Sequence, residues 1–381
     1  MNKANDLLRI LSIVPYKVFP AVMGGQKGIA LFYKYFSKEV SLTCLTVKKN
    51  EANESYPVLN QLSDSKLRYI NPFLFFKIKN IATDNACTHL LFEHPYYAWL
   101  ICLFKLFSSY KIIVHSHNIE SERFKSIGKW WWKILWYYER MAYRLATNVW
   151  FKTDEDKEYA QLYFKLDEKK CMTIPYGIEA TKLPGVEELR ESKKQVQQLY
   201  SISENDLIIL FNGTLNYKPN LDALRSILDN INPLLLKTSL QYKFIICGKG
   251  LPAEMEGLNA YRNSNIIYAG FVDDIDLYFK ACDMFLNPLQ DGGGIKTKLV
   301  EALGFGKKCV SSNNGAIGVK PECTGGRLHM VADKDWEAYS TALLDMSVKK
   351  IDNDNTAFYT VFSWKNIARK AAGSLHDDSH E

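Results

Sequence analysis

The sequence predicts an α/β protein of two domains, each built on a parallel sheet. Three observations support this prediction. Apolar runs of strand length, such as residues 8–14 and 207–211, alternate with segments whose apolar residues recur at helical spacing. Glycine or polar residues follow many of these runs, as is typical at the carboxyl ends of buried parallel strands. The chain has 381 residues, enough for two domains that each bury a core. We therefore expect two Rossmann-like domains.

The composition is that of an ordinary globular protein. Hydrophobic residues make up 47% of the chain and charged residues 24%, which argues against wholesale disorder. The net charge of +6 permits a local basic face toward phosphates or an anionic membrane, but it does not call for nucleic acid as a partner.

Targeting and metal signals are weak. The amino-terminal apolar run is short and lacks a small-residue cleavage site, so we expect no signal peptide. The most apolar region, residues 96–107, is interrupted by Lys105 and is shorter than the roughly 20 residues that span a bilayer. The eight cysteines are scattered, without a C-x-x-C pair or a Cys/His cluster. These features predict reduced thiols, a cytoplasmic location and no bound metal.

The first half opens with a βαβ pattern. The strand 8–14 is followed by Gly24 and Gly25, a helix over about 26–36, and a strand over 40–47. Glycines at the mouth of this helix would let a ligand approach the backbone, and a plain turn is the alternative interpretation.

Two histidines follow a later strand of the first half. The strand 111–114 runs into the sequence HSHNIE, and polar residues at such a strand end lie where open α/β sheets bind ligands. His117 is the first candidate for a site residue and His115 the second, with Asn118 and Glu120 beside them. A hydrogen-bonded structural histidine is the alternative.

The second half centres on residues 287–319. Three glycines, Gly292 to Gly294, lead into a helical segment at about 295–303. Backbone N–H groups of such a loop can approach an anion, and a helix N-terminus favours negative charge. Lys296 and Lys298 would oppose the helix dipole there unless a diphosphate neutralised them. Glu301 lies one turn further and could reach a hydroxylated group. A tight connection between strand and helix is the alternative.

This stretch resembles the donor-site signature E-G-x-G-x-x-x-x-E-A of the retaining GT-B glycosyltransferases of group 1, family 4. Glu301 and Ala302 match the second acidic residue and its follower. The first acidic position falls on Gly293, so the sequence departs from the signature there, and Asp291 is the candidate substitute. Three further strings are similar to family segments, namely HNIE at 117–120, PYGIE at 175–179 and GTLNYKPN at 213–220. The GFV string at 270–272 is similar to the segment that borders the nucleotide base.

The resemblance implies two Rossmann-like domains with a deep cleft between them. It implies an acceptor-side domain at 1–180, a donor-binding domain at 181–357, and a C-terminal helix at 358–381 that packs back on the first domain. The implied catalytic residues are His117, Lys218, Lys298 and Glu301. The implied donor-binding residues are Gly24, Gly25, Gly213, Asn220, Phe271, Val272, Gly293, Gly294, Ile295, Lys296, Thr297 and Leu299.

The expected activity is transfer of a sugar from a nucleoside-diphosphate sugar to a glycan or a lipid-linked saccharide. The resemblance implies retention of configuration by front-face substitution, without a metal or other cofactor. A sugar-nucleotide epimerase of the same design and a non-catalytic scaffold remain alternatives. The departure at Gly293 supports the scaffold.

The aromatic segment 129–145 has the most unusual composition. It begins KWWWKILWYYER and continues at helical spacing, with more aromatic rings than one buried face accommodates. Rings interleaved with Lys and Arg suit stacking on sugars or the headgroup level of an anionic membrane. We expect one long amphipathic helix that brings the protein to a lipid-carried acceptor. Packing of the rings into the first domain is the alternative.

Overall fold

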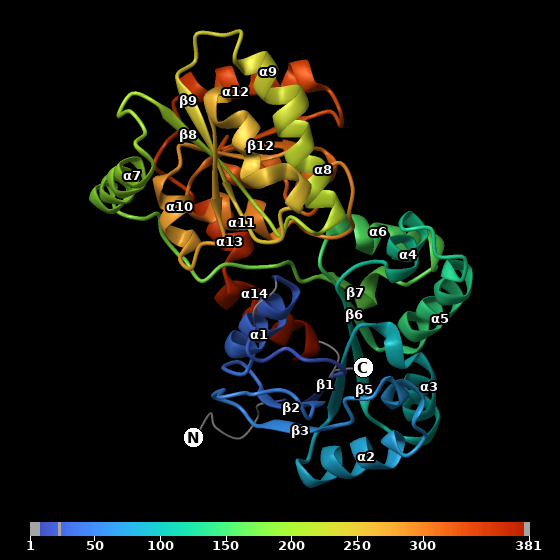
Figure 1. Ribbon diagram of the computed structural model, residues 1–381. Helices are drawn as coiled ribbons and strands as arrows, with labels where there is room; N and C mark the ends of the chain where they lie inside the picture. Colours follow the sequence, from blue (N-terminus) through green and yellow to red (C-terminus); the bar gives the residue numbers. More distant parts are fainter. Residues whose placement is uncertain (1–7, 22–23, 377–381) are drawn as a thin grey trace. The chain divides into compact units, whose positions relative to one another are not determined.

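The computed structural model describes residues 8–21 and 24–376, which form two compact units (Figure 1). The first unit extends to Gly177 and includes the chain again from Trp364, and the second is Ile178–Ser363. Each unit contains one fully parallel sheet with helices on its faces. The α/β class with two Rossmann-like domains is confirmed.

The first unit holds a seven-stranded sheet in the order β3-β2-β1-β4-β5-β6-β7. The order reverses between β1 and β4, which is where open sheets of this kind bind ligands, beyond the carboxyl ends of the strands. The strands are β1 (Arg9–Val14), β2 (Ser41–Val47), β3 (Val58–Leu62), β4 (His89–Glu93), β5 (Lys111–Ser116), β6 (Asn148–Phe151) and β7 (Cys171–Thr173).

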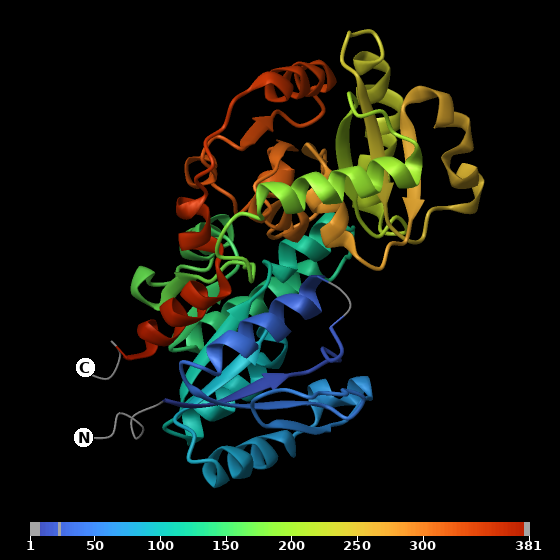
Figure 2. The same cartoon turned by 90° about the vertical axis from the view of Figure 1, so that its left-hand side faces the viewer.

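Seven α-helices belong to the described part of the first unit. α1 and α14 pack against each other on one face of the sheet, as Figures 1 and 2 show, and Phe32 and Trp364 meet between them. α2, α3 and α5 supply the core on the other face. The helices are α1 (Gly24–Phe36), α2 (Leu74–Asp84), α3 (Ala98–Phe107), α4 (Glu120–Ser126), α5 (Trp132–Leu145), α6 (Asp154–Tyr163) and α14 (Trp364–His376).

The second unit has a six-stranded sheet in the order β10-β9-β8-β11-β12-β13. Here the order reverses between β8 and β11, so the loops that follow these two strands lie at the expected ligand position. The strands are β8 (Leu207–Asn212), β9 (Tyr242–Cys247), β10 (Ile266–Gly270), β11 (Met284–Asn287), β12 (Lys308–Ser312) and β13 (Leu328–Val331).

The helices of the second unit cover both faces of this sheet. A π-helical turn at Ile227–Ile231 joins α8 to α9, so helical structure is continuous from Lys218 to Leu235. The helices are α7 (Val186–Tyr200), α8 (Lys218–Ser226), α9 (Asn232–Leu235), α10 (Ile275–Ala281), α11 (Thr297–Gly304), α12 (Trp336–Val348) and α13 (Thr356–Phe362).

Two expected helices differ from the structure. The single helix expected over 358–381 is interrupted at Ser363, which is extended and forms a parallel bridge with Ile178. Its last part, 377–381, lies outside the described residues. The Ile178 N–H donates to the Phe362 carbonyl at 2.7 Å, a contact between distant segments that local sequence does not encode. The aromatic helix begins at Trp132 instead of residue 129, and Gly128, which has a left-handed backbone (φ 73°), separates this segment from α4.

None of the helices among the described residues is both long and apolar enough to span a bilayer.

Candidate functional site: the glycine-rich loop and the histidine cluster

The glycine-rich loop, residues 288–296, connects β11 to α11 in the second unit. Gly292 (φ 104°) and Gly294 (φ 68°) have left-handed backbones, which glycine adopts without a steric cost. The Lys296 ammonium donates to the carbonyls of Gly292 at 2.7 Å and of Gly294 at 2.9 Å. Lys296 therefore holds the shape of the loop, a role that the sequence did not reveal.

The loop after β8 lies against this loop, because β8 and β11 are neighbours. A Cβ atom built on Gly292 would lie 3.9 Å from Pro219 Cγ and 3.9 Å from the Tyr217 hydroxyl. Within the β8 loop, a Cβ atom on Gly213 would lie 2.8 Å from the Asn220 side-chain amide. That amide donates to the Thr214 carbonyl at 3.0 Å. Gly213 and Asn220, both predicted donor-binding residues, thus fix the loop that faces the glycine-rich segment.

α11 begins directly after the glycine-rich loop, so its N-terminus lies at the switch point of the sheet. Thr297 is its first residue, and Lys298 and Glu301 lie on one side, with Nζ and Oε2 3.0 Å apart. Both side chains are partly exposed. Leu299 is fully buried, so only its backbone could contact a ligand.

Two other predicted residues are exposed near this edge of the sheet. Lys218 opens α8 and forms an ion pair with Asp222. This hydrogen-bonded pair raises the pKa of Lys218, with a further contribution from Asp291 of the glycine-rich loop. Phe271 follows β10 with its ring exposed, and the Lys249 ammonium lies 6.0 Å from its centroid. Val272 comes next.

Buried polar groups anchor the base of the glycine-rich loop. The Asn287 amide donates to Ser311 Oγ at 3.0 Å and to the Gly315 carbonyl at 2.8 Å. The Ser312 hydroxyl donates to the Leu289 carbonyl and accepts from the Gly315 N–H at 2.8 Å. Bonds that join two loops and two strands hold the loop in one conformation.

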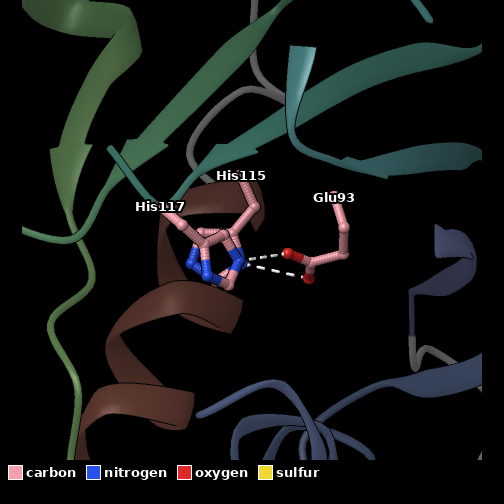
Figure 3. A group of neighbouring side chains, drawn as sticks. All are labelled: Glu93, His115 and His117. Atoms are coloured by element: carbon pink, nitrogen blue, oxygen red, sulfur yellow. Dashed lines mark hydrogen bonds and ion pairs between the residues drawn. The ribbon is translucent and has the colours of Figure 1, made fainter. Parts of the chain in front are cut away.

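The first unit carries a second polar cluster at the carboxyl ends of β4 and β5 (Figure 3). Glu93 and His115 are register partners on these strands. Glu93 Oε1 lies 3.1 Å from His115 Nδ1, and Glu93 Oε2 lies 2.6 Å from His117 Nε2. The Tyr33 hydroxyl also donates to Oε1 at 2.7 Å. The fully buried carboxylate thus receives hydrogen bonds from three side chains.

The protonation states in this cluster follow from burial. Burial lowers the pKa of His115 to about 4 and the pKa of His117 well below 6.5. Burial raises the pKa of Glu93, but contacts with both histidines outweigh this effect and hold it well below its usual 4.5. At neutral pH the rings are therefore neutral, and each uses an N–H to bind an ionised carboxylate.

His94 and Glu120 extend the cluster. The His94 ring stacks between Tyr96, with centroids 4.9 Å apart, and His117, with centroids 4.4 Å apart. Its Nδ1 lies 3.5 Å from the Glu120 carboxylate. Burial raises the pKa of Glu120, but His94 and Arg123 lower it to about 2.

Glu139 of α5 holds the backbone of this segment. Its carboxylate accepts the N–H groups of Glu120 at 2.9 Å and Ser121 at 3.0 Å. It thereby caps the start of α4, directly after the histidine segment. α5 thus positions the segment that carries His117.

A family model described as "Glycosyl transferases group 1" matches residues 206–347. That segment contains both loops at the switch point of the second unit. Residues 206–347 are a group 1 glycosyltransferase domain.

Known proteins align with a longer part of the chain than residues 206–347. An uncharacterized 44.6 kDa protein in the cps region of Klebsiella pneumoniae is 23% identical over 255 residues. That alignment covers 64% of this chain but only 61% of the relative, less than two thirds of its length.

Solved structures align with nearly the whole chain. Sucrose-phosphate synthase from Thermosynechococcus elongatus aligns with 97% of this chain and 99% of its own, at 15% identity and a TM-score of 0.72. HepE from Anabaena in complex with UDP aligns with 97% of this chain and 100% of its own, at 15% identity and a TM-score of 0.71. HepE has also been solved with UDP-glucose. These likenesses show that the group 1 glycosyltransferase domain belongs to a GT-B fold.

The structure places the predicted site residues in two groups. The group 1 glycosyltransferase domain brings the glycine-rich loop, Lys218, Gly213 and Asn220 together, with Phe271 and Val272 at the end of the outer strand β10. The first unit holds His117 and the pair Gly24 and Gly25, which form the first turn of α1.

Sequence reasoning missed three polar residues of the first unit. Glu93 ends β4, His94 follows it, and Lys152 follows β6. Lys152 is buried, and its ammonium makes no hydrogen bond within the described residues. The signal was present, because all three residues lie at the carboxyl ends of apolar strands just as His115 does.

The ligand atoms of Glu93, His115 and His117 lie within 4.8 Å of one another, a donor set that zinc accepts. In the structure both histidine nitrogens bind the Glu93 carboxylate. Burial lowers the pKa of both histidines and the Lys152 ammonium lowers it further, so a metal ion would add to positive charge that is already present. The observed contacts therefore fit a hydrogen-bonded cluster better than a metal centre.

Proposed function

We propose that the protein transfers a sugar from a nucleoside-diphosphate sugar to a hydroxyl of a glycan or lipid-linked saccharide, with retention and without a metal. The observation that carries this proposal is the pairing of the β8 and β11 loops at the switch point, beside the N-terminus of α11. The group 1 family match and the structural likeness to HepE, solved with UDP and UDP-glucose, support it.

The diphosphate lies over the glycine-rich loop in this proposal. Backbone N–H groups of residues 292–295 and the N-terminus of α11 supply preorganised donors. Lys298 and Lys218 add positive charge near them. Because negative charge grows on the phosphate oxygen as the sugar leaves, these groups lower the barrier to departure.

Lys298 and Glu301 exchange partners when the donor binds. In the structure their side chains bind each other at 3.0 Å. A diphosphate above the loop draws the ammonium toward itself. The Glu301 carboxylate then accepts hydrogen bonds from the two ribose hydroxyls of the nucleotide. The exposed Phe271 and the adjacent Val272 border the base.

His117 contacts a hydroxyl of the transferred sugar. Glu93 is a positioning residue in this scheme, because it binds Nε2 of the ring and leaves Nδ1 as the hydrogen-bond acceptor. Gly24 and Gly25 leave room beside α1 for the phosphates. Retention then follows from front-face attack by the acceptor on an oxocarbenium-like sugar.

The acceptor is carried by a lipid at the cytoplasmic face of a membrane. Trp130, two residues before α5, and Ile134 and Tyr137 of α5 present an apolar stripe, and Trp130 is 82% exposed. Lys129 and Lys133 flank this stripe, whereas Trp136 packs on Phe164 and Tyr143 is buried. Aromatic and basic side chains in this arrangement suit an anionic membrane interface.

A thermal-shift panel of UDP, GDP, ADP and CMP sugars tests the activity. We expect one diphosphate sugar to raise the Tm, increasingly so at higher concentration, and Lys298→Ala and Glu301→Gln to reduce the shift. Incubation of that donor without an acceptor should leave it unconverted, since conversion would identify an epimerase. Absence of a shift with every sugar would reject the proposal.

A further inference from the structure

The second unit contains a pocket at the edge of the sheet opposite the glycine-rich loop. The pocket has a volume of about 570 Å³, and all its lining residues lie between 189 and 353. Three lining residues show where the pocket lies. They are at or just before the first residues of β11, β12 and β13, namely Asp283, Lys308 and Arg327. The strands are parallel, so these amino-terminal ends lie at the edge away from the donor loops.

The lining is strongly basic. Seven basic side chains line the pocket and Asp283 is the one acidic residue among its lining residues. Three of the basic residues have acidic partners: Lys193 binds Asp283 at 2.8 Å, and Lys280 and Arg190 bind exposed glutamates of α7. α7 and α10, which carry these three residues, pack side by side (Figure 1).

Among the described residues, the other four cations bind backbone carbonyls and form no ion pair with a carboxylate. The Lys307 ammonium donates to the Lys280 carbonyl at 2.7 Å, and the Lys308 ammonium donates to the Ser347 carbonyl at 3.2 Å. The Lys349 ammonium donates to the Gly326 carbonyl at 2.9 Å, and the Arg327 guanidinium donates to the Asp354 carbonyl at 2.8 Å. A carbonyl orients a cation but carries no full negative charge, and Asp283 is the one carboxylate in the lining. Four ordered positive charges thus remain around one cavity.

Two of these cations are buried at a cost to the fold. Arg327 is 2% exposed, and its Nε–H has no acceptor within the described residues. Lys307 is 8% exposed. Burial lowers the pKa of Arg327, although Tyr359, Asp354 and Asp352 act in the opposite direction. A buried, unpaired guanidinium N–H is destabilising unless an acceptor reaches it.

The lysines also repel one another. Burial lowers the pKa of Lys307 and the charge of Lys193 lowers it further, although Asp283 acts in the opposite direction. Burial likewise lowers the pKa of Lys308 and Lys349 adds to the effect, with Asp283 again opposing it. An anion in the pocket would relieve this repulsion for all four cations at once.

We propose that this pocket binds the phosphate group of a small phosphorylated compound, at a site separate from the donor loops. A phosphate offers several oxygens to the Lys307, Lys308 and Lys349 ammonium groups and to the Arg327 guanidinium. The volume exceeds that of a phosphate ion and suits a molecule the size of a sugar phosphate. The site therefore takes a phosphate ester, and the ester portion fills the remaining space.

Isothermal titration calorimetry with glucose 6-phosphate tests this site, and inorganic phosphate and glucose are titrated separately. Lys308→Gln/Lys349→Gln removes two cations that are not fully buried, so the fold should persist, as a Tm near that of the wild type would show. We expect glucose 6-phosphate to bind the wild type and to bind this variant at least tenfold more weakly. Inorganic phosphate should bind and depend on the same residues, whereas glucose should not bind.

Two control variants separate this site from total charge and from the donor site. Lys237→Gln/Lys365→Gln removes the same charge at exposed positions outside the pocket, and Lys298→Ala alters the donor loop. Both should bind glucose 6-phosphate within twofold of the wild type. The inference is wrong if wild-type protein does not bind the ester. It is equally wrong if binding survives in Lys308→Gln/Lys349→Gln or is lost in Lys298→Ala, and a failure of the donor proposal would leave it unaffected.

Discussion

Nε2 of His117 lies 2.6 Å from Oε2 of Glu93, and the other oxygen of the same carboxylate lies 3.1 Å from Nδ1 of His115. Because the carboxylate accepts only, both of these ring nitrogens carry the protons of the neutral imidazoles. The proton of His117 is therefore on Nε2, and Nδ1 is available to accept a hydrogen bond. Glu93 thus determines which nitrogen of the His117 ring can accept a hydrogen bond from a hydroxyl.

Replacing Glu93 tests this arrangement. Glu93→Gln removes the charge that orients both rings, and we expect kcat/KM for sugar transfer to fall about 10- to 100-fold. The conservative Glu93→Asp should recover part of the loss, because it keeps the charge. Circular dichroism and Tm check that the fold persists. A Glu93→Gln variant with wild-type kcat/KM would show that the pair is purely structural.

The same cluster predicts a pH profile. Burial lowers the pKa of His117 well below 6.5, so its ring is already neutral at pH 6. We therefore expect a plot of kcat/KM between pH 6 and 8 to show no inflection near pH 6.5 that His117 causes. If the wild type shows such an inflection and His117→Ala removes it, the ring titrates in this range and the assigned state is wrong.

Lys298 should matter for turnover more than for stability. Its ammonium is partly exposed and binds Glu301, so Lys298→Ala should leave the Tm nearly unchanged. If the ammonium stabilises the departing diphosphate, kcat/KM should fall by a factor equivalent to about 2–4 kcal/mol. The exposed Lys237→Gln is the matched control and should have no effect. Turnover of Lys298→Ala within twofold of the wild type would refute the assigned role.

Replacing the buried Lys152 with an apolar residue should raise the stability of the fold by an amount that depends on pH. Burial lowers its pKa to about 8 from 10.5, with partial compensation from Glu93. The folded state thus holds this proton less tightly than the unfolded chain. The cost is constant below pH 8 and vanishes as the pH rises toward 10.5. Lys152→Met should therefore raise the free energy of unfolding by about 1–3 kcal/mol at pH 7, and by progressively less above pH 8.

Denaturant unfolding of both proteins at several pH values measures this difference, with the exposed Lys169→Met as the control. A Lys152→Met variant that is less stable at pH 7 would mean that the ammonium has a stabilising partner.

The apolar stripe on α5 should govern membrane binding. Trp130→Ser/Ile134→Ser removes two exposed apolar side chains, and we expect it to reduce flotation with anionic liposomes and turnover of a lipid-linked acceptor. Turnover of a short soluble acceptor should be unchanged. Leu199→Ser/Val348→Ser removes comparably exposed apolar residues from the second unit and should keep wild-type flotation. Wild-type protein that remains unbound to the liposomes would contradict the proposed membrane contact.

The sequence predicted the sheets well because buried parallel strands are continuous apolar runs. The strands predicted at 8–14, 40–47, 111–114 and 207–211 match β1, β2, β5 and β8 to within a residue or two. The strands β3 and β13 were not singled out. β3 is a short edge strand, VLNQL, with two exposed residues, and its pairing with β2 depends on the fold and not on a local apolar run.

The sites were harder to predict, because their partners are distant in sequence. Spacing placed Lys298 and Glu301 on one side of a helix, and the structure joins them. Spacing could not show that Lys296 binds loop carbonyls or that Glu93 binds His117. The basic pocket could not be predicted, since its residues come from five separate segments.

A crystal structure with the nucleoside diphosphate selected by the thermal-shift panel is the most direct measurement. The account predicts the diphosphate against the N–H groups of residues 292–295, with the Lys298 ammonium moved from Glu301 to a phosphate oxygen and Glu301 bound to the ribose. A diphosphate found only in the basic pocket, or a glycine-rich loop left empty at saturating ligand, would contradict it.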